Sequence, residues 1–264
     1  MLLQKQFSPP FFLKNRHIQS MLASVRFRAP KDSHPVFANA AESILETSGG
    51  ARLQAFYSPL KDAKGLVFLI HGWEGSAGST YVKSAAAFLY DRGYEIFRPN
   101  LRDHGNTHHL NTGLFFGTLF EEVYEAAVRA ADLAGDRPFF IAGCSLGGNY
   151  ALRLARESSS RPIANLSRVV AVSPVLDPAK ATRAVDETFF YRLYFLRKWK
   201  RSLARKQQVF PEIYDFSRAM RKNTIYGVTE ALLPEYSPYA TAEQYFRGYT
   251  LTRDALLHIP VPAL

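Results

Sequence analysis

The chain has 264 residues, 47% of them hydrophobic and 21% charged, and its 33 basic and 23 acidic side chains give a net charge of +10. This composition is typical of an ordinary soluble globular protein, and no apolar run approaches the ~20 residues that cross a bilayer. The positive charge is not accompanied by a nucleic-acid-binding motif, so we expect no nucleic-acid partner. The single cysteine, Cys144, excludes an internal disulfide. Together with an N-terminus that does not read as a signal peptide, it favours the cytoplasm.

The chain begins with an irregular stretch that leads into a hairpin. Prolines at positions 9, 10, 30 and 35 interrupt any regular pattern, so residues 1–40 are predicted to form an irregular arm. Alternating side chains over residues 43–47 and 52–57 predict two strands, joined by a turn at Gly49 and Gly50.

Strands and helices then alternate along the chain. Strands are predicted at 65–72, 94–101, 137–144 and 167–174, and helices at 81–91, 120–133 and 149–157. This order predicts one α/β domain over residues 1–264, with a mostly parallel central sheet and helices on both faces. Residues 177–249 are helical, aromatic and basic, and are interpreted as a cap inserted over the carboxyl edge of the sheet. Residues 259–264 look like the start of another strand, so further C-terminal strands are expected to be missing from this sequence.

The most informative stretch is Gly143-Cys144-Ser145-Leu146-Gly147, between a buried strand and a helix. A serine hydroxyl becomes a nucleophile when a base takes its proton and hydrogen-bond donors stabilise the oxyanion that forms. A sharp strand-to-helix turn exposes the serine oxygen and directs the helix N-terminus at the developing charge. Glycines two residues before and after the serine remove side chains that would clash in this turn. The pattern predicts a nucleophile elbow with Ser145 as the nucleophile.

Other reactive side chains are given structural interpretations. A metal site is suggested by four residues of one loop, which are Asp103, His104, His108 and His109. Two of these histidines have the spacing of H-E-x-x-H, but the general-base Glu is absent and the segment is a loop, so hydrogen bonding within the loop is preferred and no metal is expected. His71 is expected to be a hydrogen-bonded residue of its loop, and Cys144 a buried small residue. His258 lies on the wrong side of its strand to reach the nucleophile.

Three loops together resemble those of the α/β-hydrolase superfamily. Beside the elbow, His71-Gly72-Trp73 resembles the family's oxyanion loop. The stretch Asn100-Leu-Arg-Asp-His-Gly-Asn106 is similar to the D-x-R-G-H-G loop, with Asn100 in place of Asp and Asp103 in place of Gly. With the N-terminal Pro10-Phe-Phe-Leu-Lys-Asn-Arg-His-Ile-Gln-Ser20, the chain resembles the bacterial YheT-like branch (AB hydrolase 4 type), which is related to the ABHD1/ABHD3-type esterases and lipases.

The resemblance implies a serine carboxylic-ester hydrolase, similar to esterases and acylglycerol lipases, that acts on a small-molecule acyl ester without a cofactor. It implies an acyl-serine intermediate at Ser145 and an oxyanion hole made by the backbone N–H groups of Trp73 and Leu146. In this family an acid and then a histidine follow the serine, and both are expected beyond Leu264. The sequence is therefore expected to be a fragment with weak or no activity. Asp177 is the alternative acid within it.

Two other functions stay open. An acyltransferase would use the same elbow with a different acceptor, and a truncated, inactive hydrolase fold would act as a binding protein. Residues 189–206 carry seven Lys or Arg and no acidic residue, and Leu196, Trp199 and Leu203 recur at helical spacing. This segment is predicted to be a lid helix with either a solvated basic face or a peripheral contact with an anionic membrane.

Overall fold

The structure is a computed structural model that describes residues 8–15, 18–19, 22, 25 and 29–264. The predicted N-terminal arm lies partly outside these residues. Its described part contains a 3-10 turn, η1 (Phe11–Leu13), and a short helix, α2 (Pro35–Ala38). Helix α2 packs against the domain, since Val36 is fully buried and its carbonyl oxygen accepts a hydrogen bond from Ser58.

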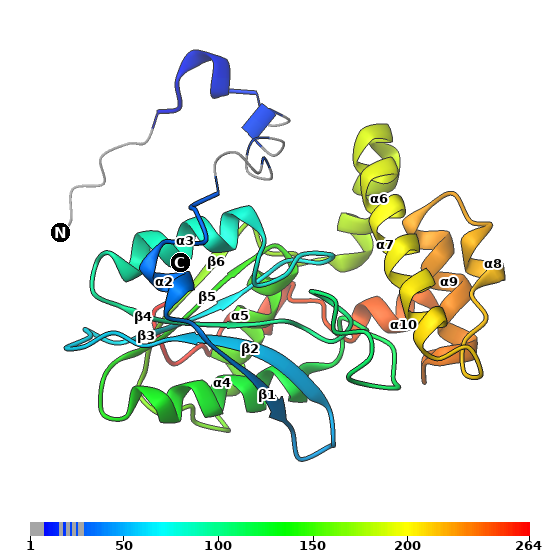
Figure 1. Cartoon of the computed structure of the whole chain (residues 1–264). Coiled ribbons are helices and arrows are strands. Elements are labelled where there is room, and N and C mark those ends of the chain that lie inside the picture. Colours follow the sequence, from blue (N-terminus) through cyan, green and yellow to red (C-terminus); the bar gives the residue numbers. More distant parts are fainter. Residues whose placement is uncertain (1–7, 16–17, 20–21, 23–24, 26–28) are drawn as a thin grey trace.

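Six strands form one mixed sheet in the order β1-β2-β4-β3-β5-β6 (Figure 1). They are β1 (Ala41–Glu46), β2 (Arg52–Ser58), β3 (Leu66–Ile70), β4 (Glu95–Pro99), β5 (Phe139–Cys144) and β6 (Leu166–Val172). β1 and β2 form the predicted hairpin, with Glu46 opposite Arg52, and β2 also runs antiparallel to β4. The pairs from β4 to β6 are parallel, so the predicted parallel core is confirmed, with an antiparallel hairpin at one edge.

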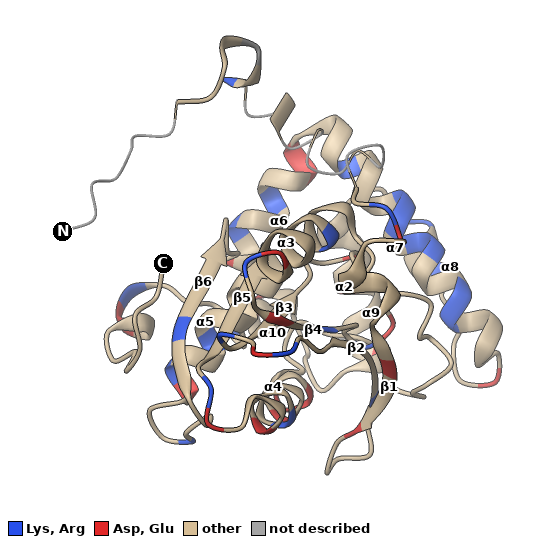
Figure 2. Ribbon diagram, turned by 60° about the vertical axis from the view of Figure 1, so that its left-hand side comes forward, with Lys and Arg blue, Asp and Glu red and all other residues tan. Residues whose placement is uncertain are grey.

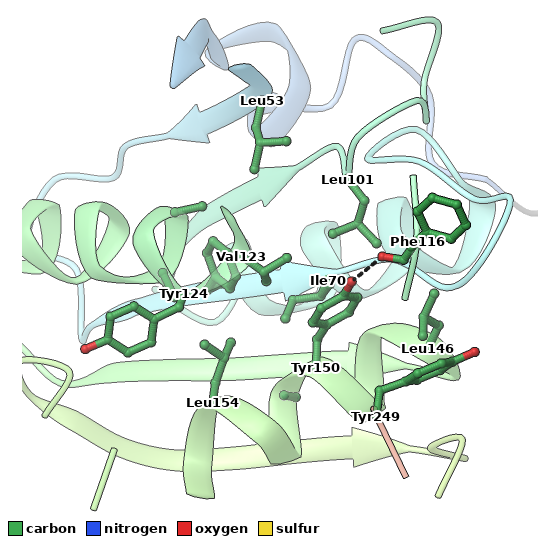
Figure 3. Packing of buried hydrophobic residues seen from close by; sticks show 14 of the residues in the cluster. Leu53, Ile70, Leu101, Phe116, Val123, Tyr124, Leu146, Tyr150, Leu154 and Tyr249 are labelled. Carbon is green, nitrogen blue, oxygen red and sulfur yellow. Dashed lines mark hydrogen bonds between the residues drawn. The ribbon is translucent and has the colours of Figure 1, made fainter. Parts of the chain in front are cut away.

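Helices cover both faces of the sheet (Figure 1). Helices α2 and α3 (Thr80–Tyr90) cover one face, and α4 (Phe120–Ala134) and α5 (Leu146–Glu157) the other. Strand β3 is apolar throughout because both of its faces are buried. Val67 and Leu69 pack with residues of α3, whereas Phe68 and Ile70 pack with residues of α4 and α5. Figure 3 shows this second layer, in which the Tyr150 hydroxyl of α5 donates to the carbonyl oxygen of Phe116 at 3.5 Å.

Five helices form a cap at one end of the sheet (Figure 1). They are α6 (Pro178–Glu187), α7 (Phe189–Val209), α8 (Ser217–Met220), α9 (Ile225–Tyr236) and α10 (Ala242–Arg247). The chain enters and leaves the cap through one neck, where Leu251 N donates to Leu176 O at 2.7 Å. The buried Asn149 of α5 holds both sides of this neck, because its Nδ2 donates to Val175 O and Tyr249 O, each at 2.8 Å.

After the cap, a 3-10 turn, η3 (Arg253–Leu256), leads back to the sheet. Ala263 forms a parallel bridge with Val169 of β6, and Leu264 N donates to Val169 O at 3.0 Å. The residues predicted to begin another strand therefore lie at the edge of β6. None of the helices in the described ranges is long and apolar enough to cross a membrane.

Candidate active site

Ser145 makes the turn between β5 and α5 by itself. Its backbone has φ 55° and ψ −117°, a region that a non-glycine residue enters at an energetic cost. The turn is held by main-chain hydrogen bonds, from Ser145 N to Val172 O at 2.9 Å and from Asn149 N to Ser145 O at 3.0 Å. Helix α5 begins at Leu146, three residues before the predicted start. The two glycines of its first turn have low helix propensity, so packing rather than sequence pattern sets this boundary.

The two glycines flanking Ser145 lie where backbones touch. A Cβ at Gly143 would lie 2.1 Å from Gly147 O, and a Cβ at Gly147 would lie 2.3 Å from Ile70 O. The end of β5, the start of α5 and the end of β3 are therefore in direct backbone contact, which no side chain larger than hydrogen allows.

The Ser145 side chain is exposed and lines a cavity of about 1420 Å³ between the sheet and the cap. The loop after β3 passes beside it, because a Cβ at Gly72 would lie 3.3 Å from Ser145 Cβ. Trp73 follows directly in the chain and also lines the cavity. Leu146 occupies the first position of α5, where a helix leaves its backbone N–H without a partner inside the helix.

Helix α7 of the cap packs on the loop after β3. The Trp73 ring stacks on Phe195 with centroids 5.4 Å apart and meets Trp199 edge-on at 5.0 Å. One residue further on, the Lys198 ammonium donates to the carbonyl oxygen of Glu74. Burial raises the pKa of the Glu74 carboxyl to about 7, against the opposing effect of the Lys198 charge. At neutral pH this carboxyl is therefore partly protonated.

His71 is a structural residue of its loop. It is fully buried, its Nδ1 pairs with Gly72 O at 2.8 Å, and its Nε2 accepts from Leu101 N at 3.1 Å. Burial lowers the pKa of His71 to about 4, so the ring is neutral at physiological pH. It links the loop after β3 to the loop after β4.

His104 and His108 are also held by their surroundings. His104 pairs through Nδ1 with Arg102 O at 2.6 Å and accepts through Nε2 from Glu74 N at 3.1 Å. The Nε2 of His108 contacts Ser202 Oγ of α7 at 2.8 Å. These contacts leave both rings directed at loop and cap groups rather than at Ser145. In the ranges that the structure describes, no group of three or more His, Cys, Asp or Glu side chains is placed to hold a metal ion.

The most buried charged contact joins the cap to the loop after β4. Lys206 of α7 is 0% exposed, and its Nζ lies 2.7 Å from Asp103 Oδ1. Three carbonyl oxygens also accept from this ammonium, those of His108, Asn111 and Gly113, at 3.3, 2.7 and 2.9 Å. Burial raises the pKa of Asp103 and lowers that of Lys206, and each charge opposes this effect on the other. Asp103 has φ 58°, which explains why the resembled loop has glycine at this position.

Two of the remaining candidates do not line the cavity, and burial disfavours the reactive form of the third. Asp177 is the N-cap of α6, where its Oδ1 accepts from Lys180 N at 3.0 Å and its Oδ2 lies 3.5 Å from Lys180 Nζ. Asp177 and the exposed His258 are not among the described residues that line the cavity. Cys144 does line it, but burial raises the pKa of its thiol and so disfavours the nucleophilic thiolate.

Sequence reasoning missed two residues that shape the site, Lys206 and Asn149. Lys206 is one of seven basic residues in α7, and nothing in the sequence distinguishes the buried one from the others. Asn149 directly follows the glycines of the elbow, and a polar residue on the inner face of a buried helix was a signal that could have been used.

The chain is similar to known proteins in its family and in its fold. Residues 67–264 match the model of the Alpha/beta hydrolase family. No curated protein matches the chain. The solved structure of a 2,6-dihydroxy-pseudo-oxynicotine hydrolase aligns with 87% of this chain and 53% of its own, at 18% identity and a TM-score of 0.52. At this identity, the likeness shows a shared fold and nothing about function.

Two further solved structures are more distant. An esterase from Pyrococcus furiosus aligns over 65% of this chain and 79% of its own, at 16% identity and a TM-score of 0.46. The hydrolase GrgF from Penicillium aligns over 59% and 54%, at 14% identity and a TM-score of 0.45. The chain thus spans about half the length of GrgF and of the pseudo-oxynicotine hydrolase. Because the family match extends over most of the sequence, the chain belongs to the alpha/beta hydrolase family.

Proposed function

We propose that this chain carries the nucleophile and the oxyanion hole of a serine carboxylic-ester hydrolase of the YheT-like branch, with Ser145 as the nucleophile. The observation that carries the proposal is the strained backbone of Ser145, held between two glycines that have no room for a Cβ. Backbone strain persists where the surrounding structure enforces it, and such residues cluster at active sites. Here the strained residue is exposed and lines the large cavity under the cap.

The reaction in this proposal is a two-step acyl transfer. Ser145 Oγ attacks the acyl carbonyl carbon, and the backbone N–H groups of Trp73 and Leu146 donate to the oxyanion. Collapse of this intermediate expels the alcohol and leaves an acyl-serine, which water then hydrolyses. The base that takes the serine proton and its acid partner are proposed to follow Leu264, as the family order implies. Asp177 is a weaker candidate for the acid, since the N-terminus of α6 already uses its carboxylate.

Covalent labelling tests the nucleophile. We expect a fluorophosphonate probe to label a longer form of the protein that contains the family's Asp and His, with the adduct on Ser145 in peptide mass spectrometry. Ser145→Ala is expected to abolish labelling, and Ser173→Ala, which alters another exposed cavity serine, to leave it unchanged. Labelling that persists in Ser145→Ala would contradict the proposal. The 264-residue chain is expected to hydrolyse esters weakly, because loss of triad members leaves residual catalysis.

Labelling together with analysis of the reaction products separates the alternatives. An acyltransferase would yield a new ester when an alcohol acceptor is added, whereas a hydrolase yields the free acid. A binding protein would retain ligand affinity in the longer form but would not be labelled.

A peripheral membrane contact is a second proposal, favoured by the N-terminal end of α7. Phe189, Phe190 and Leu193 are 58%, 79% and 56% exposed, beside the basic Arg192. Such a mixture suits the interface of an anionic bilayer. If Phe190→Ser/Leu193→Ser sediments with anionic vesicles as well as the unaltered chain, this contact is excluded. The free Cys144 fits a reducing compartment, and we propose the cytoplasm.

A further inference from the structure

Three arginines of α7 form a row along the wall of the cavity. Arg197, Arg201 and Arg205 are spaced four residues apart, which places them on one face of the helix. All three line the cavity that also contains Ser145. At a helical rise of about 1.5 Å per residue, the row is about 12 Å long. Figure 2 shows the basic residues distributed along α7.

In the described part of the chain, no carboxylate forms an ion pair with this row. Among the ion pairs of the described residues, none includes an arginine of the row or the adjacent Lys198. Arg205 donates to the neutral amide oxygen of Asn106 at 2.6 Å, and Lys198 donates to the carbonyl oxygen of Glu74. Like charges four residues apart destabilise a helix. An anion bound at this wall of the cavity would offset the repulsion among the three arginines.

The two acidic residues of the cavity do not offset the row. Asp103 is already paired with Lys206. Glu74 is half-buried, and its raised pKa, about 7, leaves it partly protonated at neutral pH. The remaining cavity lysine, Lys83, pairs with Asp32. The wall made by α7 is therefore positively charged on balance.

Other lining residues of the cavity are apolar. They come from the end of β6, the loop after it, and helices α6, α9 and α10, and include Val172, Val175, Ala181, Val185, Ile225, Leu232 and Phe246. A cavity with one cationic wall and a set of apolar lining residues suits an amphiphile, which is a molecule with an apolar chain and a charged head.

The cationic row is connected to the nucleophile through a short series of contacts. Gly72 lies against Ser145, Trp73 stacks on Phe195 of α7, and Glu74 accepts from Lys198. One loop of three residues thus separates the reacting serine from the helix that carries the arginines.

We propose that the substrate is an acyl ester whose alcohol part carries a phosphate group. The phosphate binds the row of Arg197, Arg201 and Arg205, and the acyl chain lies against the apolar lining residues. A guanidinium binds phosphate oxygens through two parallel hydrogen bonds, and a phosphate monoester carries nearly two negative charges, which suits several adjacent cations. This inference rests on the proposed ester hydrolysis and names its substrate class.

Tryptophan fluorescence can test this binding without catalysis. The chain has two tryptophans, Trp73 and Trp199, and both line the cavity. The Ser145→Ala chain would be titrated with octanoyl glycerol phosphate and with octanoyl glycerol, both below their micelle-forming concentrations. We expect the phosphate ester to bind about tenfold more tightly at low salt, which corresponds to about 1.4 kcal/mol, and we expect added salt to weaken this preference.

Two charge-matched variants complete the experiment. Arg197→Gln/Arg201→Gln/Arg205→Gln is expected to remove the preference for the phosphate ester. Lys61→Gln/Arg168→Gln/Arg247→Gln removes the same charge at exposed positions outside the cavity lining and is expected to keep it. Circular dichroism during urea unfolding would establish that both variants are folded.

Several results would overturn the inference. One is equal affinity for the two esters, and another is a preference for the phosphate ester that the arginine variant retains. The inference would also fail if inorganic phosphate competed as strongly as the phosphate ester, or if the fluorescence responded only to anionic vesicles. The absence of a saturable fluorescence change with either ester would also overturn it. Failure of fluorophosphonate labelling at Ser145 is a separate result that removes ester hydrolysis and leaves this binding measurement standing.

Discussion

The elbow depends on the smallest side chains in the sequence. Gly147 illustrates this, because a Cβ there would lie 2.3 Å from Ile70 O, a backbone atom that cannot rotate away. We expect Gly147→Ala to lower the free energy of unfolding by roughly 1–3 kcal/mol, since overpacking forces backbone shifts. It is also expected to slow covalent labelling at Ser145, because the same shift moves this serine. Urea unfolding followed by circular dichroism measures the first effect.

Gly49 provides the matched control for this substitution. A Cβ at Gly49 would meet nothing within 4 Å, and its backbone is outside the left-handed region. Gly49→Ala is therefore expected to change the free energy of unfolding by less than about 0.5 kcal/mol. If the two variants proved equally stable, the close backbone contact at the elbow would not be a real constraint on this protein.

At the scale of the element, a buried ion pair between Lys206 and Asp103 is among the contacts that join α7 to the rest of the domain. We expect Lys206→Met to cost about 3–5 kcal/mol, because it leaves the Asp103 carboxylate buried without its counter-charge. The loss is expected in urea unfolding at neutral pH. Lys180→Met is the control, since Lys180 is 84% exposed and its contact with Asp177 is a surface ion pair worth at most about 1 kcal/mol.

A double-mutant cycle separates the pair from the packing of α7. Asp103→Asn keeps an acceptor for the Phe115 N–H and a residue type that tolerates the left-handed backbone at this position. In the double variant Lys206→Met/Asp103→Asn, the loss is expected to be clearly smaller than the sum of the two single losses. Strict additivity would show that the two side chains do not stabilise each other.

The contrast between the elbow and α7 explains what the sequence could predict. The strand-turn-helix at Ser145 could be predicted, because few residue types allow its main-chain geometry. The strands could also be predicted from the sequence. β3, for example, is buried on both faces and therefore has an unbroken apolar run. The start of α5 at Leu146 could not be predicted, because tertiary contacts override the low helix propensity of the two glycines in its first turn. The pairing of Lys206 with Asp103 joins residues 103 positions apart, and no local pattern records it.

At the scale of the whole molecule, the site lies where the loops after β3 and β4 meet the cap, and buried neutral histidines hold these loops together. Burial lowers the pKa of His71 and of His108 to about 4, and it lowers that of His104 well below its usual value. His108 contacts the cap through Ser202, and His71 and His104 join the two loops. Protonation of these rings therefore opposes the packing of the site as a whole.

This arrangement predicts that the folded protein loses stability in mild acid. In the unfolded chain His71 titrates near 6.5 and in the folded chain near 4, so between these values the unfolded state binds a proton that the folded state does not. The stabilisation from this group is fully present above about pH 6.5 and is lost as the pH falls toward 4, with a total of about 3 kcal/mol. Measurements of the free energy of unfolding from pH 7 to pH 4 should show this decline. His71→Gln should reduce its slope by up to about 1.4 kcal/mol per pH unit.

The quantity to compare is the slope of the free energy of unfolding against pH, not its absolute value. His71→Gln also disturbs hydrogen bonds to Gly72 and Leu101 and is expected to be less stable at every pH. His109→Gln, at an exposed position of the same loop region, controls for the loss of a histidine as such. If His71→Gln kept the slope of the unaltered chain, the acid sensitivity would belong to other groups, namely His104, His108 or the carboxylates. A reduced slope would show that the two loops beside Ser145 are joined by a ring that must stay neutral, which would favour activity at neutral rather than acidic pH.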